Sequence, residues 1–89
     1  MKHANIDHLI ASEQLEEAIA ALSDAIASSK TDASLYFTRG KLLWRIGKHS
    51  AAMSDYAHAA ELDPSSPAVY ALEQARDIAV FFNPDLYNP

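Results

Sequence analysis

Histidines and acidic side chains are the residues of this sequence best suited to chemistry, and their spacing argues against a metal site. His3 and His8 are five residues apart, so on a helix they fall on different faces. His3 and Asp7 have the four-residue spacing of a helical metal pair, but two ligands are too few to hold an ion. We expect His49 to be a packed, half-buried ring and His58 to be solvated. The sequence therefore predicts no bound metal.

Other catalytic and cofactor-binding patterns are also missing from the sequence. It contains no cysteine, which excludes disulfides and thiolate zinc sites. The only glycines, Gly40 and Gly47, do not form a phosphate-binding loop. Serine, histidine and aspartate all occur, but none stands in a recognisable nucleophile motif. We expect a protein that is not an enzyme and that uses no cofactor.

Length and composition favour one small helical domain, residues 1–89. Hydrophobic residues make up 49% of the 89 residues, and two glycines are few, which suits closely packed helices. A formal net charge of −5 argues against a nucleic-acid partner, because such proteins normally carry a basic face. No apolar run is long enough to span a membrane, and the first residues lack the apolar core of a signal peptide. A cytoplasmic location is the resulting expectation.

The pattern of apolar residues and breakers predicts an all-α protein. Five helices are expected, near residues 2–12, 15–29, 33–46, 50–62 and 67–82. Asp32 is a suitable N-cap for the third helix, and Ser66 precedes Pro67 at the start of the fifth. The connections between the helices are short, as antiparallel helix pairs require.

One stretch in the middle of the chain carries a specific motif. It reads Tyr36-x2-Arg39-Gly40-x2-Leu43, then Ala52-x3-Tyr56, then Pro64. This spacing resembles the tetratricopeptide repeat, a helix-turn-helix unit of 34 residues. The well-matched repeat spans residues 32–65.

The motif residues have physical roles in such a helix pair. Gly40 and Ala52 are small where the two helices approach closely, and Gly47 suits the turn because glycine accepts positive φ. Arg39 departs from the pattern, which prefers leucine there. A buried guanidinium needs a partner, so we expect it to reach Asp55 on the next helix.

Displacing the sequence by one repeat length predicts incomplete units on both sides. Residues 2–31 form a degenerate repeat, in which Ala18 matches Ala52, Leu22 matches Tyr56 and Ile6 takes the place of the glycine. Residues 66–82 are expected to be a single closing helix that covers the end of the array. The tail, residues 83–89, is apolar enough that we expect it to dock on the last helices.

The resemblance implies a right-handed superhelix of antiparallel helix pairs whose first helices line a concave groove. The groove positions carried over to this chain are Ser34, Phe37, Lys41 and Trp44, with His3, Asp7 and Ile10 upstream and Ala71, Ala75 and Ile78 in the closing helix. Phe37, Lys41 and Trp44 also form one helical stripe, with two aromatic anchors and one cation. They predict an adaptor or scaffold that binds another protein or a peptide segment.

Two alternatives stay open. Phe37 and Trp44 are equally able to fill the groove by packing against Ile10 and the closing helix. The function is then better explained by a self-assembling structural unit, joined through exposed repeat ends. The expected state is a monomer or a weak homo-oligomer. Repeats that clamp the carboxylate of chaperone tails use asparagines that this chain lacks, so that partner is not expected.

Overall fold

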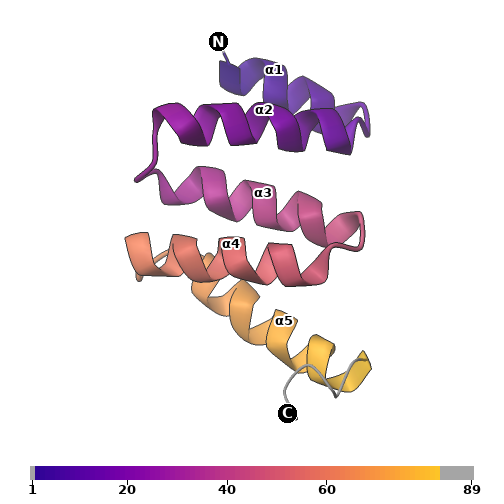
Figure 1. Cartoon of the computed structure of the whole chain (residues 1–89), viewed down its shortest axis with the longest axis vertical. Helices are drawn as coiled ribbons and strands as arrows, with labels where there is room; N and C mark the ends of the chain where they lie inside the picture. The colour runs from indigo at the N-terminus through magenta and orange to yellow at the C-terminus, as the bar shows by residue number, and fades with distance from the viewer. Residues whose placement is uncertain (1, 83–89) are drawn as a thin grey trace.

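The chain folds into five α-helices, as its sequence predicts. The structure, a computed structural model, describes residues 2–82, with the side chains of residues 5–77. The helices are α1 (Lys2–Ala11), α2 (Leu15–Ser28), α3 (Ala33–Arg45), α4 (His49–Leu62) and α5 (Ala68–Phe82), and no strand occurs in this part of the chain (Figure 1). Each observed helix end lies within one residue of its predicted position. The predicted docking of residues 83–89 lies outside the described residues.

Local capping explains where α3 and α5 begin. The Asp32 carboxylate accepts a hydrogen bond of 3.0 Å from the backbone N–H of Ser34, so the predicted N-cap is confirmed. The hydroxyl of Ser66 accepts the N–H of Ala68 at 3.0 Å in the same way. These bonds satisfy donors that the first turn of each helix otherwise leaves unpaired.

The turns that close the two helix pairs share one backbone conformation but not one residue type. Gly47, between α3 and α4, has φ of 88°. Glu13 occupies the equivalent position between α1 and α2, and its φ of 62° is also left-handed. The Glu13 carboxylate accepts hydrogen bonds of 3.0 and 3.1 Å from Nη2 of Arg45. A side chain there is strained, because left-handed backbone brings Cβ close to the following carbonyl.

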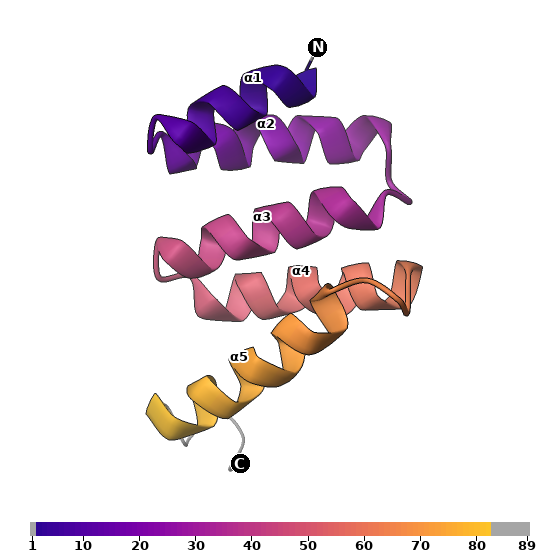
Figure 2. The ribbon, with the colours of Figure 1, turned by 180° about the vertical axis from the view of Figure 1, so that it is seen from behind.

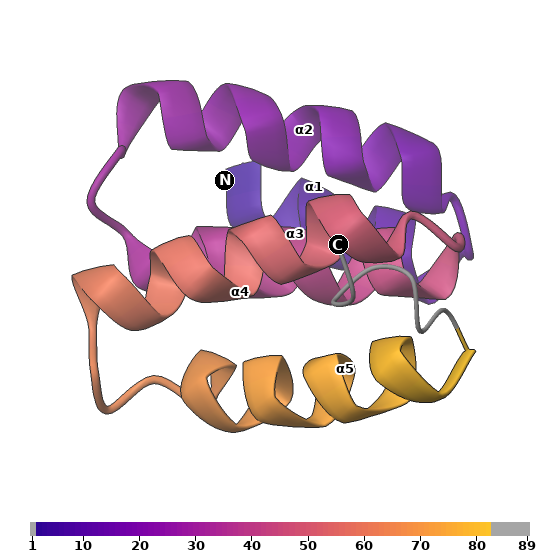
Figure 3. The same ribbon diagram turned by 60° about the horizontal axis from the view of Figure 1, so that its bottom comes forward.

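The helices stack in chain order, and the core is divided along the stack. Figure 2 shows α1 to α4 as roughly antiparallel layers, with α5 crossing α4 obliquely, and Figure 3 shows α2 and α5 at opposite sides of the molecule. One buried cluster joins α1, α2 and α3 around Ile6, Leu22 and Leu35. The other joins α4 and α5 around Ala52, Tyr56 and Ala75. Residues of α3 pack against both clusters, so this helix is the centre of the module.

Close approach of α3 and α4 depends on Gly40. A Cβ atom at this position would lie 2.7 Å from Cε1 of Tyr56 and 3.2 Å from the carbonyl oxygen of Ala52. The absent side chain of Gly40 thus makes room for the large ring of Tyr56. In the upstream pair the same seam is filled by Ile6 and Leu22, which are both buried.

Candidate functional site

Arg39 and Asp55 form the predicted contact and hold the helices together. Nε and Nη2 of Arg39 each donate a hydrogen bond of 2.7 Å to the two carboxylate oxygens of Asp55. Nη1 donates a third bond, 3.1 Å long, to the hydroxyl of Ser23 on α2. The hydrogen bonds that Arg39 donates to Asp55 raise the pKa of Arg39, although burial acts in the opposite direction. One guanidinium therefore joins α2, α3 and α4.

The predicted binding stripe runs along α3, on the side away from this ion pair. Lys41 is exposed, and its Nζ lies 4.8 Å from the centre of the Phe37 ring, a cation–π contact. The other neighbour of Phe37 is the Tyr56 ring, with 5.9 Å between ring centres. Phe37 is half-buried, so it contributes to the core and also supports the lysine.

Trp44 lies at the end of the stripe, stacked on the first residue of α4. Its ring centre is 4.0 Å from that of His49, and the two planes are inclined by 23°. His49 is exposed, so the expectation that it would be half-buried is wrong. The reason is its position at the helix start, where it covers Trp44 from outside. Trp44 itself is half-buried and packs against the α4–α5 cluster.

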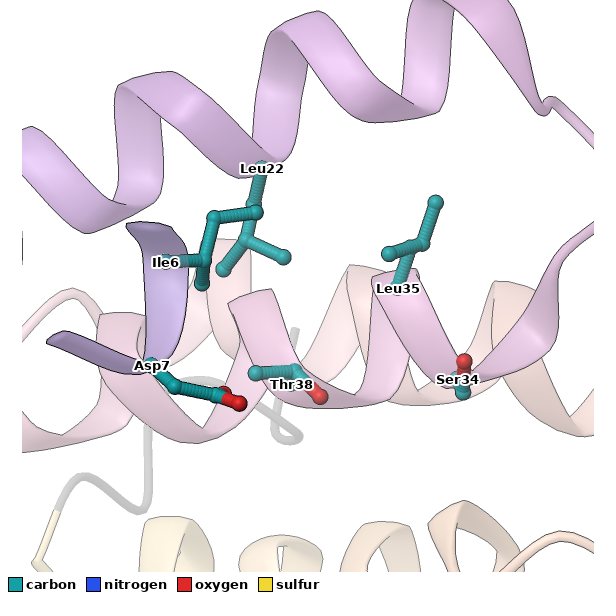
Figure 4. A pocket seen from close by; sticks show the side chains of 6 residues that line it. All are labelled: Ile6, Asp7, Leu22, Ser34, Leu35 and Thr38. Carbon is teal, nitrogen blue, oxygen red and sulfur yellow. The ribbon is translucent and has the colours of Figure 1, made fainter. Parts of the chain in front are cut away.

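Two hollows adjoin the predicted binding stripe of α3. The first, here called the α1–α3 pocket, has a volume of about 220 Å³ and is lined by Ile6, Asp7, Leu22, Ser34, Leu35 and Thr38 (Figure 4). The second, the α3–α5 pocket, measures about 190 Å³ and is lined by Trp44, Tyr56, Ala71, Gln74 and Ala75. The stripe of α3 therefore has one hollow toward α1 and another toward α5.

The other predicted groove residues fall in different environments. Asp7 and Ser34 are exposed at the α1–α3 pocket, as a groove position requires. Ile10 packs against the first core cluster. Ala75 is only 3% exposed and belongs to the wall of the α3–α5 pocket. Ile78 lies on α5, and its side chain is outside the described residues.

Sequence reasoning missed several residues that shape these hollows. Thr38 lines the α1–α3 pocket together with Ser34, and its four-residue spacing from Ser34 was the available signal. Leu35 is a buried residue of the same pocket. A wider hollow of about 410 Å³ also lies between α2 and α4, next to the Arg39–Asp55 pair. Its lining includes Ile19 of α2 and Leu43 of α3, and of these only Leu43 belongs to the repeat motif.

Metal and membrane sites receive no support within the described part of the chain. No group of three or more metal-binding side chains comes together among these residues. The side chain of His3 lies outside the described side chains, so the structure gives no distance between His3 and Asp7. None of the described helices has the length and apolar character needed to cross a membrane.

Comparison with protein families agrees with the paired geometry of α3 and α4. Residues 33–66 match the family model of the tetratricopeptide repeat. The matched segment is one repeat length long. It covers the Gly40–Tyr56 seam, the turn at Gly47 and the capping Ser66 of α5. Tetratricopeptide repeats generally mediate protein–protein interaction or serve as scaffolds. Neither the comparison with curated proteins nor that with solved structures gave a match.

Proposed function

We propose that the protein is an adaptor that binds a segment of another protein across α3, on the face formed by Ser34, Phe37, Lys41 and Trp44. The observation that carries this proposal is the pair of hollows on either side of that stripe. An extended segment that crosses α3 has a recess for a side chain on each side of the helix. The exposed ammonium of Lys41 stands between them and attracts an acidic group of the segment.

Aromatic surface supplies the anchorage in this proposal. Trp44 is held in place by His49 on one side and by the α4–α5 cluster on the other, so little side-chain entropy is lost when a partner covers it. Phe37 is fixed against Tyr56 in the same manner. Rigid, half-buried aromatic rings are typical of the residues that dominate binding energy at protein interfaces.

The outer face of α5 disfavours the self-assembly alternative. A further helix stacked there would contact the positions of α5 that lie one repeat length after Arg39, Gly40 and Leu43. In α5 these positions carry Glu73, Gln74 and Asp77, all exposed. A charged side chain in place of Leu43 is costly to bury between helices. We therefore favour the adaptor over a stacked array.

The test is peptide selection on the purified protein with a displayed random library. A synthetic peptide from the selected sequences should bind the wild type, and Trp44→Ala should weaken that binding at least about tenfold, as expected of an anchor. Tyr70→Ala is the matched control, because Tyr70 is 65% exposed on α5 and lines neither hollow.

Circular dichroism checks that Trp44→Ala retains its helices. If that variant unfolds, Lys41→Glu replaces it, because Lys41 is exposed and its substitution leaves the core intact. Equal binding by wild type and Lys41→Glu, or selected peptides that bind Trp44→Ala as tightly as wild type, would contradict the proposal. A size that grows with concentration in sedimentation would favour self-assembly.

A further inference from the structure

Two opposite charges occupy equivalent positions on neighbouring first helices. Asp7 on α1 and Lys41 on α3 are separated by one repeat length, so they stand at the same level of the stack. Both side chains are exposed, and they form no ion pair with each other. Neither forms an ion pair with any other side chain among residues 5–77. The proposed binding face thus carries one negative and one positive site at equivalent positions of the stack.

The negative site has a recess beside it. In Figure 4 the carboxylate of Asp7 and the hydroxyls of Ser34 and Thr38 lie along one side of the α1–α3 pocket, while apolar side chains occupy the other. Ile6, Leu22 and Leu35 form the apolar part, and Leu22 is only 1% exposed. A volume of about 220 Å³ is small for a whole ligand and suits a single long side chain.

Lysine and arginine match this combination of surfaces. Their aliphatic stems pack on apolar surface while the charged head stays at a polar rim. A head group at Asp7 gains a charge-assisted hydrogen bond, and the hydroxyl of Thr38 offers a further acceptor. An acidic side chain would be repelled by Asp7. A purely apolar one would partly desolvate the carboxylate without pairing it, which is unfavourable.

We propose that the α1–α3 pocket takes a lysine or arginine side chain of the bound segment, while an acidic side chain of the same segment pairs with Lys41. This inference rests on the proposed function and adds the chemistry of the partner. Asp7 and Lys41 lie on different helices, α1 and α3, so the segment carries its basic and its acidic residue at separate positions. The order of these two residues fixes the direction of the segment across α3.

The experiment uses the peptide obtained by selection on the full chain. Its basic residue is replaced by norleucine, which keeps the aliphatic stem and removes the charge. Both peptides are measured by fluorescence anisotropy against wild type and Asp7→Asn. With the basic peptide, Asp7→Asn should weaken binding about fivefold or more, and with the norleucine peptide it should have no effect.

Asp24→Asn is the matched control, because it removes the same charge from an exposed position on α2 that does not line the pocket. It should bind both peptides as the wild type does. If Asp24→Asn weakens binding of the basic peptide as much as Asp7→Asn does, the effect comes from net charge alone and the inference is overturned. The inference is also overturned if the selected peptides contain no basic residue, or if Asp7→Asn weakens binding of the basic and the norleucine peptide equally. If Trp44→Ala still weakens binding in those cases, the proposed function stands without this refinement, whereas insensitivity to Trp44→Ala removes the proposed function itself.

Discussion

The two helix pairs of this protein, α1–α2 and α3–α4, fill one seam in two ways. In the α3–α4 seam the side-chain volume at this level comes from α4 alone, because Gly40 has no side chain and Tyr56 contributes a full ring. In α1–α2 it is shared between Ile6 and Leu22 at the equivalent positions. Total volume and apolar character matter more to a core than the identity of each residue. The repeat motif is therefore one solution to a packing problem that the first pair solves differently.

The two helix pairs also differ in their charged residues. Arg39 and Asp55 join α3 to α4, while Asn5 and Ala21 stand at the equivalent positions in α1 and α2. The upstream pair thus lacks an ion pair at this level of the seam. Its attachment to the rest of the stack instead includes the Arg39–Ser23 bond and the exposed Glu13–Arg45 pair. The second pair is held by directional bonds, and the first depends more on apolar contact.

The largest loss of stability is expected when the isoleucine of the α1–α2 seam is introduced at the equivalent position of the α3–α4 seam. Gly40→Ile places a branched side chain against Tyr56, within a space that already excludes a Cβ atom. We expect it to lower the free energy of unfolding by more than about 3 kcal/mol, at the upper end of overpacking effects. Urea unfolding followed by circular dichroism measures this change.

The double variant Gly40→Ile/Tyr56→Leu sharpens the comparison, because it recreates the Ile6–Leu22 arrangement in α3–α4. It should recover more than half of the lost stability. If the double variant is no more stable than Gly40→Ile alone, the two seams are not interchangeable, and the backbone separation of α3 and α4 must be fixed by other contacts.

A smaller effect is expected from breaking the ion pair. The side chains of Arg39 and Asp55 are 23% and 8% exposed, so Asp55→Ala leaves a partly buried guanidinium without its main partner. We expect a loss of about 2–3 kcal/mol, below the full cost of orphaning a completely buried charge. Thermal and urea unfolding both report it.

The control for this prediction removes both charges. Arg39→Met/Asp55→Leu should be close to the wild type in stability, because apolar residues of similar size avoid the desolvation cost. If Asp55→Ala costs less than about 0.5 kcal/mol, the pair behaves like a surface salt bridge, and the contrast in charge between the helix pairs has little energetic meaning.

The smallest expected effect compares the two turns. At Gly47 no atom lies within 4 Å of an added Cβ, so Gly47→Ala tests the left-handed backbone alone. It should cost about 1 kcal/mol. Glu13→Ala keeps a non-glycine residue at positive φ and loses only an exposed ion pair, so it should change stability by less than about 0.5 kcal/mol. Equal losses at both positions, measured by urea unfolding, would show that the Glu13–Arg45 pair matters more than φ.

The sequence was informative about local order and less so about the surface. Helix ends were predictable because Asp32, Ser66 and Gly47 have strong positional preferences. The Arg39–Asp55 contact was predictable because a charge in a seam requires a partner. Glu13 at positive φ could have been found by displacing Gly47 by one repeat length.

The hollows beside α3 were not predictable. Their existence depends on how far α1 and α5 stand from α3, and that distance follows from packing throughout the stack. The Trp44–His49 stack has the same origin, because it joins residues on either side of a turn whose geometry the pattern does not specify.

The stacking order has a consequence for how the chain folds. The principal contacts join helices that are neighbours in the sequence: α1 with α2, α2 with α3, α3 with α4 and α4 with α5. Few distant segments must find each other, so the loop-closure entropy is small and we expect folding within about microseconds to milliseconds. The α3–α4 hairpin has the close seam and the ion pair, which makes it the natural nucleus. We therefore expect amide exchange to become faster outward from this hairpin, toward α1 in one direction and α5 in the other.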